Sequence, residues 1–143
     1  MSTQAEKGLA FRELHEGEPF VIPNPWDTGS ARALEALGFE ALATTSAGFA
    51  WVLGKLDTQV TRDELVAHVA ELASATDLPL NVDSERCYPD DPGGVAETVR
   101  LLGEAGAAGC SIEDWNPVTG RIEDVGLAGE RVAEAAAAAR AFD

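Results

Sequence analysis

The sequence has few positive charges and no long apolar run. Only 10 Lys and Arg stand against 25 Asp and Glu among its 143 residues, which gives a formal net charge of -15. Such a chain repels the phosphates of nucleic acids and anionic membrane surfaces, so neither is expected as a partner. No apolar stretch approaches the roughly 20 residues needed to cross a bilayer, and residues 1–10 lack the apolar segment of a signal peptide. We therefore expect a cytoplasmic protein.

Cysteine is also scarce. Cys87 and Cys110 form neither the paired spacing of a metal site nor a disulfide framework, so reduced thiols are expected. Hydrophobic residues nevertheless make up 45% of the chain, which argues against disorder. Residues 1–143 are long enough to form one domain with a substantial core.

Short apolar runs alternate with amphipathic segments, a pattern typical of an α/β fold. The sequence predicts a leading helix over 4–16, strands at 19–23, 39–45, 78–82 and 109–112, and helices at 30–37, 61–75, 95–105 and 127–141. A loop of about a dozen residues is expected after residue 45. Four βα units in series predict a parallel sheet with both faces covered. Repeats of about 30 residues fit half of a TIM-type (β/α)8 barrel or a small flavodoxin-like sheet, which a non-consecutive strand order would favour.

Acidic residues follow two neighbouring strands of this predicted sheet. Asp83 and Glu85 follow the third strand, and Glu113 follows the fourth. In extended chain Asp83 and Glu85 point the same way, and ligands of parallel sheets bind at these strand ends. Converging carboxylates repel one another unless a cation joins them, and oxygen ligands without histidine suit Mg2+ or Mn2+. The alternative is that these acids cap helices or lie solvated on loops.

Small residues follow the second strand. Ser46, Ala47 and Gly48 would let backbone amides approach an anion closely, although a tight turn is the favoured explanation of this segment taken alone. Asp57, in the loop that follows, could reach the site as an outer partner of a metal ion. Trp26 either lines the pocket or closes the end of the barrel.

Four segments, in this order, resemble the isocitrate lyase/phosphoenolpyruvate mutase family. They read NPWDTGSARALEALGFEALATTSAG at 24–48, LD at 56–57, LPLNVDSERCY at 78–88 and AGAAGCSIED at 105–114. The resemblance implies a (β/α)8 barrel with a Mg2+ site. It also implies chemistry on small 2-oxo or 2-hydroxy acids or phosphonates, by cleavage of C–C or P–C bonds or by phosphoryl movement through a metal-stabilised enolate.

The resemblance assigns roles to individual positions. Asp83 would bind the metal directly, while Glu85, Glu113 and Asp57 would hold it largely through water. The substrate carboxylate would contact Ser46, Ala47 and Gly48. The resemblance also makes Asp57 and Glu113 the catalytic candidates, and Trp26 and Tyr88 further substrate contacts.

Two departures from the family pattern limit these expectations. Lyases of the family carry a Lys-Lys-Cys-Gly-His loop after the fourth strand, whereas residues 115–126 read WNPVTGRIEDVG here. Isocitrate and methylisocitrate lyase activities are therefore not expected. A (β/α)8 barrel needs about 250 residues, so this chain carries only about the first four βα units. The substrate-neutralising arginine of the family comes from the later half.

Two hypotheses on function follow. The chain belongs to a lyase acting on an enolisable 2-oxo acid once the barrel is completed, or it is a catalytically inactive interaction module. In both cases a half-barrel exposes sheet edges, so a homo-oligomer is expected.

Overall fold

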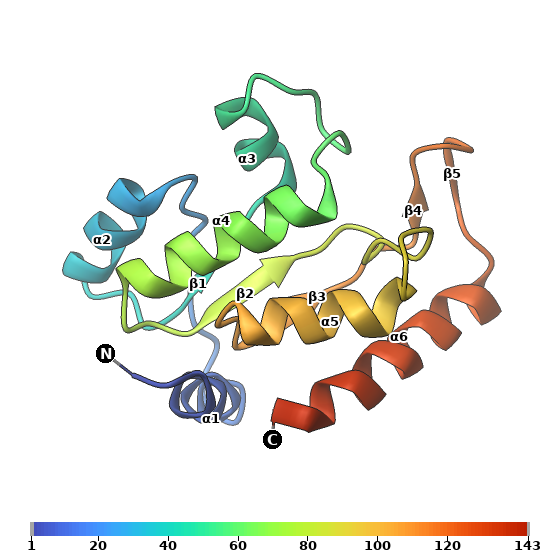
Figure 1. Cartoon of the computed structure of the whole chain (residues 1–143). Helices are drawn as coiled ribbons and strands as arrows, with labels where there is room; N and C mark the ends of the chain where they lie inside the picture. The colour runs from blue at the N-terminus through green and yellow to red at the C-terminus, as the bar shows by residue number, and fades with distance from the viewer. Residues whose placement is uncertain (1, 143) are drawn as a thin grey trace.

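The computed structural model describes residues 2–142 (Figure 1). Its elements are, in order, α1 (Gln4–Leu14), α2 (Thr28–Ala36), β1 (Leu42–Ala43), α3 (Ser46–Val52), α4 (Arg62–Ala75), β2 (Leu80–Asp83), α5 (Gly94–Glu104), β3 (Gly109–Ser111), β4 (Trp115–Asn116), β5 (Arg121–Ile122), α6 (Val125–Ala139) and a closing 3-10 turn, Arg140–Phe142. None of the helices within the described range is long and apolar enough to span a bilayer.

The main sheet is parallel, with the consecutive order β1-β2-β3. Leu42 lies opposite Leu80, and Asn81 lies opposite Gly109. In a (β/α) barrel each strand lies beside the next strand in the sequence, whereas a flavodoxin-like sheet has a non-consecutive strand order. The chain therefore forms part of a (β/α) barrel, as the sequence predicts.

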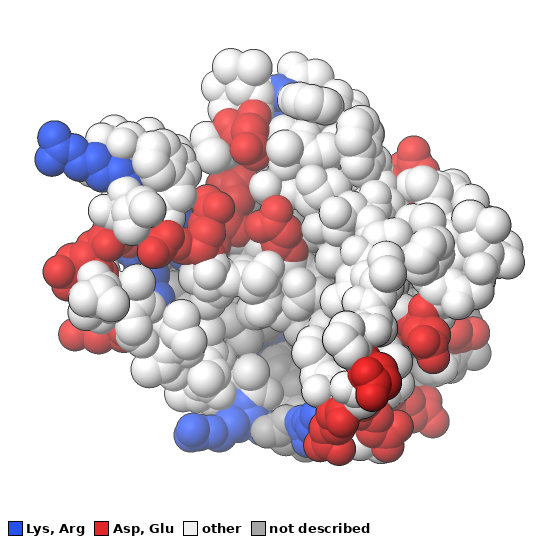
Figure 2. All heavy atoms as spheres, turned by 180° about the vertical axis from the view of Figure 1, so that it is seen from behind, with Lys and Arg blue, Asp and Glu red and all other residues white. Residues whose placement is uncertain are grey.

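Helices α4 and α5 cover one face of this sheet (Figure 1). On β2 the side chains alternate: Leu80 and Val82 are fully buried, whereas Asn81 and Asp83 are half-buried on the other face. Figure 2 shows the molecule from that side, where a group of acidic side chains lies beside a broad uncharged area. The prediction that both faces are covered is therefore wrong for the described chain, because no helix layer lies on the second face.

The core lies between the sheet and helices α2 to α5. Its main cluster of buried apolar side chains comes from the strands, from α4 and from α3. The largest fully buried members are Leu42, Leu72, Leu80, Leu102, Val69 and Val82. A second cluster joins α5 and α6 to the loop after β2 through Cys87, Val95, Val99 and Ala135.

Polar groups fix the ends of the helices. Asp27 caps α2, and Thr61 and Glu64 form the predicted capping box at the start of α4. The α1 helix attaches through a buried lysine, because Lys7 Nζ donates to the carbonyls of Ala73 and Thr76 at 2.7 Å each. These bonds occupy carbonyls at the C-terminus of α4, where a cation is favourable.

Three predicted features differ from the structure. Residues 19–23 form no strand: Pro19 and Pro23 lack an N–H, and the bond from Ala43 N–H to the Pro23 carbonyl is the link to β1. The segment after residue 45 is not a plain loop, because Thr45 caps the short helix α3. Residues 115–122, for which the sequence predicts no helix or strand, contain the antiparallel pair β4 and β5.

Candidate metal and substrate site

The site is built where the parallel strands end. In Figure 1 the strands run toward α3 and the β4–β5 hairpin, while α1 and both chain ends lie at the opposite end. Asp83 is the last residue of β2, and Glu113 follows β3 by two residues. Because neighbouring parallel strands end at the same edge, the two acids share one side of the sheet.

Asp83 is held by three hydrogen bonds. Its backbone N–H donates to Thr44 Oγ1 at 2.9 Å. Its carboxylate accepts from the N–H of Ser46 at 3.0 Å and from the N–H of Glu85 at 3.3 Å. The side chain therefore joins the start of α3 to the loop after β2, and its orientation is fixed before any ligand binds.

Glu85 departs from the extended backbone that the sequence suggests. Its φ is 51°, in the left-handed region, and so are the φ values of Cys87 (61°) and Tyr88 (47°). A non-glycine residue there costs on the order of 1 kcal/mol, and such strain clusters at functional sites. The turn buries Glu85 Oε1 without a hydrogen-bond partner. Burial, and then the charges of Asp57, Asp83 and Glu113, raise the pKa of Glu85 to about 7.

Glu113 and Asp57 complete the acidic group. Burial raises the pKa of Glu113, followed by the charges of Asp83, Asp57 and Asp114. Asp57 is exposed and accepts a 3.1 Å bond from the N–H of Thr58, whose φ is 66°. The four acids predicted as metal ligands thus lie within electrostatic reach of one another.

The carboxylates do not yet enclose an ion. Across residues 2–142 no three His, Cys, Asp or Glu side chains come close enough together to hold a metal. The donor set still fits a hard divalent cation, because all its atoms are oxygens and the buried Glu85 Oε1 has no hydrogen-bond partner. A small cavity of about 140 Å3 adjoins Glu85, lined also by Thr58, Val60, Tyr88 and Pro117.

The three small residues form the first turn of α3. Thr45 caps this helix by accepting from the N–H of Gly48 at 3.2 Å. Position 48 has no room for a side chain, because a Cβ atom there would lie 2.6 Å from Nε1 of Trp26. Trp26 therefore lies against this turn, and its ring meets that of Trp51 edge-on at 5.8 Å. Trp26 is 43% exposed, so one side of it remains open to solvent.

Tyr88 lies at the junction of two loops. Its hydroxyl donates to the carbonyl of Val60 at 3.2 Å, and its ring packs against the main core. Burial raises the pKa of this phenol above its ordinary range. The side chain predicted to contact substrate is therefore engaged with the protein itself.

Sequence reasoning missed a buried ion network at the base of the hairpin. Glu123 accepts from Arg86 at 2.8 Å and from Asn116 at 2.7 Å, and it also pairs with Arg131. The side chains of Glu123, Arg86 and Arg131 are 7%, 12% and 9% exposed. Arg86 follows Glu85 directly, so this network ties the hairpin and α6 to the loop that carries the candidate ligand. A turn signal in Asn116-Pro-Val-Thr-Gly120 could have indicated the hairpin.

Comparisons with known proteins agree with this arrangement. The family model described as phosphoenolpyruvate phosphomutase matches residues 11–143. The crystal structure of a putative lyase/mutase from Burkholderia cenocepacia superimposes with a TM-score of 0.90 at 48% identity, over 96% of this chain and 50% of that one. An uncharacterised protein of Mycobacterium tuberculosis is 41% identical over 74% of this chain and 40% of its own length. An oxaloacetate decarboxylase of Bradyrhizobium is 37% identical over 73% of this chain and 37% of its own.

The chain thus spans about half the length of the structures it matches and about 40% of the curated relatives. The matched part contains every strand-end acid described above. On this evidence the chain belongs to the phosphoenolpyruvate phosphomutase family, which includes the isocitrate-lyase-type enzymes, and it contributes part of the TIM barrel of that family.

Proposed function

We propose that this chain carries the metal-binding half of a Mg2+-dependent lyase or mutase site for small 2-oxo acids or their close relatives. The observation that carries the proposal is Glu85: a carboxylate turned inward by a strained backbone, with one buried oxygen lacking a hydrogen bond. Burial, and then the charges of three further acids, raise its pKa. Such a group costs free energy unless a proton or a cation neutralises it.

Each residue has a definite task in this proposal. Asp83 would bind Mg2+ directly, and Glu85, Glu113 and Asp57 would help to hold it. Mn2+ can take the same place. When bound, the ion supplies positive charge beside a 2-oxo group and so favours enolate character next to it.

The substrate carboxylate would lie at the first turn of α3, contacting Ser46, Ala47 and Gly48. This segment is linked to the metal ligand, because the N–H of Ser46 donates to Asp83. Trp26 covers the same turn and would form one wall of the pocket. Asp57 is the candidate for proton transfer from the loop side, and Glu113 from the β3 side. The oxaloacetate decarboxylase among the relatives supports a 2-oxo dicarboxylic acid as the substrate class.

A second candidate function is that of an inactive, self-associating module. It is favoured by the β4–β5 hairpin, which stands where lyases of the family carry their Lys-Lys-Cys-Gly-His loop. The two candidates differ in turnover. Metal-dependent consumption of oxaloacetate would exclude the inactive module, whereas metal binding without turnover would support it.

The metal assignment is tested by titration calorimetry with Mg2+ and Mn2+. Asp83→Asn keeps an oxygen for the N–H of Ser46 but loses the charge, so it should abolish binding. Glu71→Gln removes an exposed carboxylate from α4 and serves as the matched control. Equal binding by wild type and Asp83→Asn would refute the assignment.

A further inference from the structure

Two loops that carry candidate ligands contact each other at their bases. The Asp57 loop comprises residues 53–61, between α3 and α4, and the Glu85 loop comprises residues 84–93, between β2 and α5. The Asp57 loop has left-handed backbone at Thr58, and the Glu85 loop has it at Glu85 itself, Cys87 and Tyr88. The positions of these two carboxylates therefore depend on how the loops are fixed to one another.

The first connection is the hydroxyl of Tyr88. From the Glu85 loop it donates to the carbonyl of Val60 in the Asp57 loop at 3.2 Å. Val60 is only 6% exposed, so water is largely kept from this bond. Val60 lies three residues after Asp57, and Tyr88 lies three residues after Glu85.

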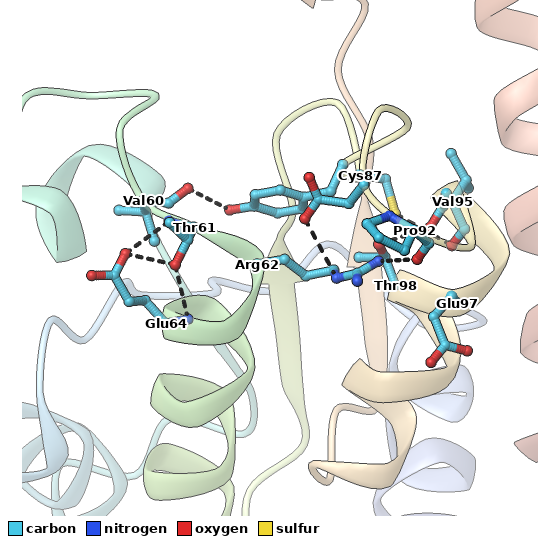
Figure 3. A network of polar contacts seen from close by, with 12 residues as sticks. Val60, Thr61, Arg62, Glu64, Cys87, Pro92, Val95, Glu97 and Thr98 are labelled. Carbon is cyan, nitrogen blue, oxygen red and sulfur yellow. Dashed lines mark hydrogen bonds and ion pairs between the residues drawn. The ribbon is translucent and has the colours of Figure 1, made fainter.

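The second connection is Arg62, at the start of α4. Its Nη1 donates to the carbonyl of Pro92 at 2.9 Å, and its Nε lies 3.6 Å from a carboxylate oxygen of Asp91. Figure 3 shows the guanidinium extending from α4 to the turn that contains Pro92. The Arg62 side chain is 11% exposed, so this contact is not a loose surface pair.

The Glu85 loop is itself anchored to α5. Cys87 is fully buried and packs with Val95 in the second core cluster, and its N–H donates to the carbonyl of Ser84 at 2.8 Å. The Glu85 loop is therefore the fixed partner of the pair. The Asp57 loop is held to α4 by Lys55, whose Nζ donates to Glu64 at 2.6 Å, and to the Glu85 loop by the contacts of Tyr88 and Arg62.

We infer that Tyr88 and Arg62 are positioning residues that set the place of Asp57 relative to Glu85 and thereby the affinity of the site for a divalent cation. This inference rests on the proposed metal site and assigns Tyr88 a role through the protein, in place of direct substrate contact. The tyrosine bond holds the Asp57 loop at Val60, three residues after the acid, and the arginine bonds hold the start of α4, which follows the loop.

The test measures Mn2+ affinity by calorimetry and amide hydrogen exchange over residues 53–61, on the full chain at a temperature where it is folded. Tyr88→Phe keeps the ring in the core and removes only the hydroxyl. It should weaken Mn2+ binding about three- to tenfold, the effect of one lost hydrogen bond, and speed exchange in the Asp57 loop. Arg62→Gln should do the same, whereas Arg62→Lys, which keeps a donor, should restore part of the affinity.

Two controls separate positioning from general stability. Ser74→Ala removes a hydroxyl bonded at 2.8 Å to a backbone carbonyl at the far end of α4. Arg100→Gln removes a half-exposed arginine paired with Glu97 and Glu104 on α5. Neither should change Mn2+ affinity or exchange in the Asp57 loop, whatever it does to thermal stability.

The outcomes are distinct. Wild-type affinity in Tyr88→Phe overturns the positioning role, even if exchange becomes faster. If the wild type binds no Mn2+, the proposed metal site fails, and exchange alone then tests the link between the loops. In that case faster exchange in Tyr88→Phe supports the link, and unchanged exchange overturns it.

Discussion

His68 provides a direct test of how the α3 region is packed. It lies on α4, is 5% exposed and stacks on Phe49 of α3 with ring centroids 3.7 Å apart. Its Nε2 is buried without a hydrogen-bond partner. Burial lowers the pKa of His68 to about 4, and the charge of Asp27 offsets this only in part. The folded chain therefore holds this imidazole neutral.

The sign of the pH effect follows from linkage. The unfolded chain takes up a proton on His68 near pH 6.5, whereas the folded chain does so only near pH 4, so stability is lost as the pH falls through this window. Between pH 7 and pH 5 the loss attributable to His68 is about 2 kcal/mol, and it grows to about 3 kcal/mol at pH 4. His68→Phe keeps the stack on Phe49 and cannot titrate, so it should lack this part of the pH dependence.

Urea unfolding of wild type and His68→Phe at pH 7 and pH 5 measures the difference. Comparing the two proteins cancels the titration of the other groups. The NMR titration of the His68 ring protons checks the same value directly. If both proteins lose the same free energy, within about 0.5 kcal/mol, His68 is not held neutral and the packing described for α3 is wrong.

Three further predictions concern the site. Glu85→Gln should stabilise the metal-free chain, because it removes a buried charge among other acids, and Mg2+ should raise the Tm of the wild type but not of this variant. Gly48→Ala places a Cβ 2.6 Å from Trp26 and should cost about 1–3 kcal/mol in urea unfolding, with a change in tryptophan fluorescence. Arg131→Gln should lower the free energy of unfolding by about 2 kcal/mol, as expected for a lost hydrogen bond to a charged group. Arg100→Gln, at an exposed site, should lower it by under about 0.5 kcal/mol; thermal unfolding measures both.

Local signals predict the helices well. The capping box of Thr61 and Glu64 and the apolar face of α4 place that helix almost to the residue. The strand expected at 19–23 fails because its apolar run contains two residues that cannot donate a ladder bond. Helix α3 was missed because it is only seven residues long and its cap, Thr45, falls within the predicted strand.

The sequence is enough to select the residues of the candidate site, but it does not predict how they are arranged. Strand-end placement is enough to select Asp83, Glu85 and Glu113, because parallel topology alone brings these positions to one edge. The left-handed turn at Glu85 cannot be read from local sequence, since glutamate there is disfavoured and only the surrounding contacts hold it. The Glu123 network likewise joins segments that lie far apart in the sequence, from Arg86 to Arg131.

The electrostatics of the chain give a reason to expect a cation at the proposed site. With a net charge of -15, the protein repels the anionic acids that its family acts on. Arg62, Arg86 and Arg131 contact the strand-end loops, and each is already paired with carboxylates or carbonyls of the protein. These arginines hold the acidic loops in place, and their positive charges are offset by those partners. Positive potential at the strand ends must then come mainly from an ion on the carboxylates, so affinity for an anionic substrate and affinity for the metal should rise and fall together.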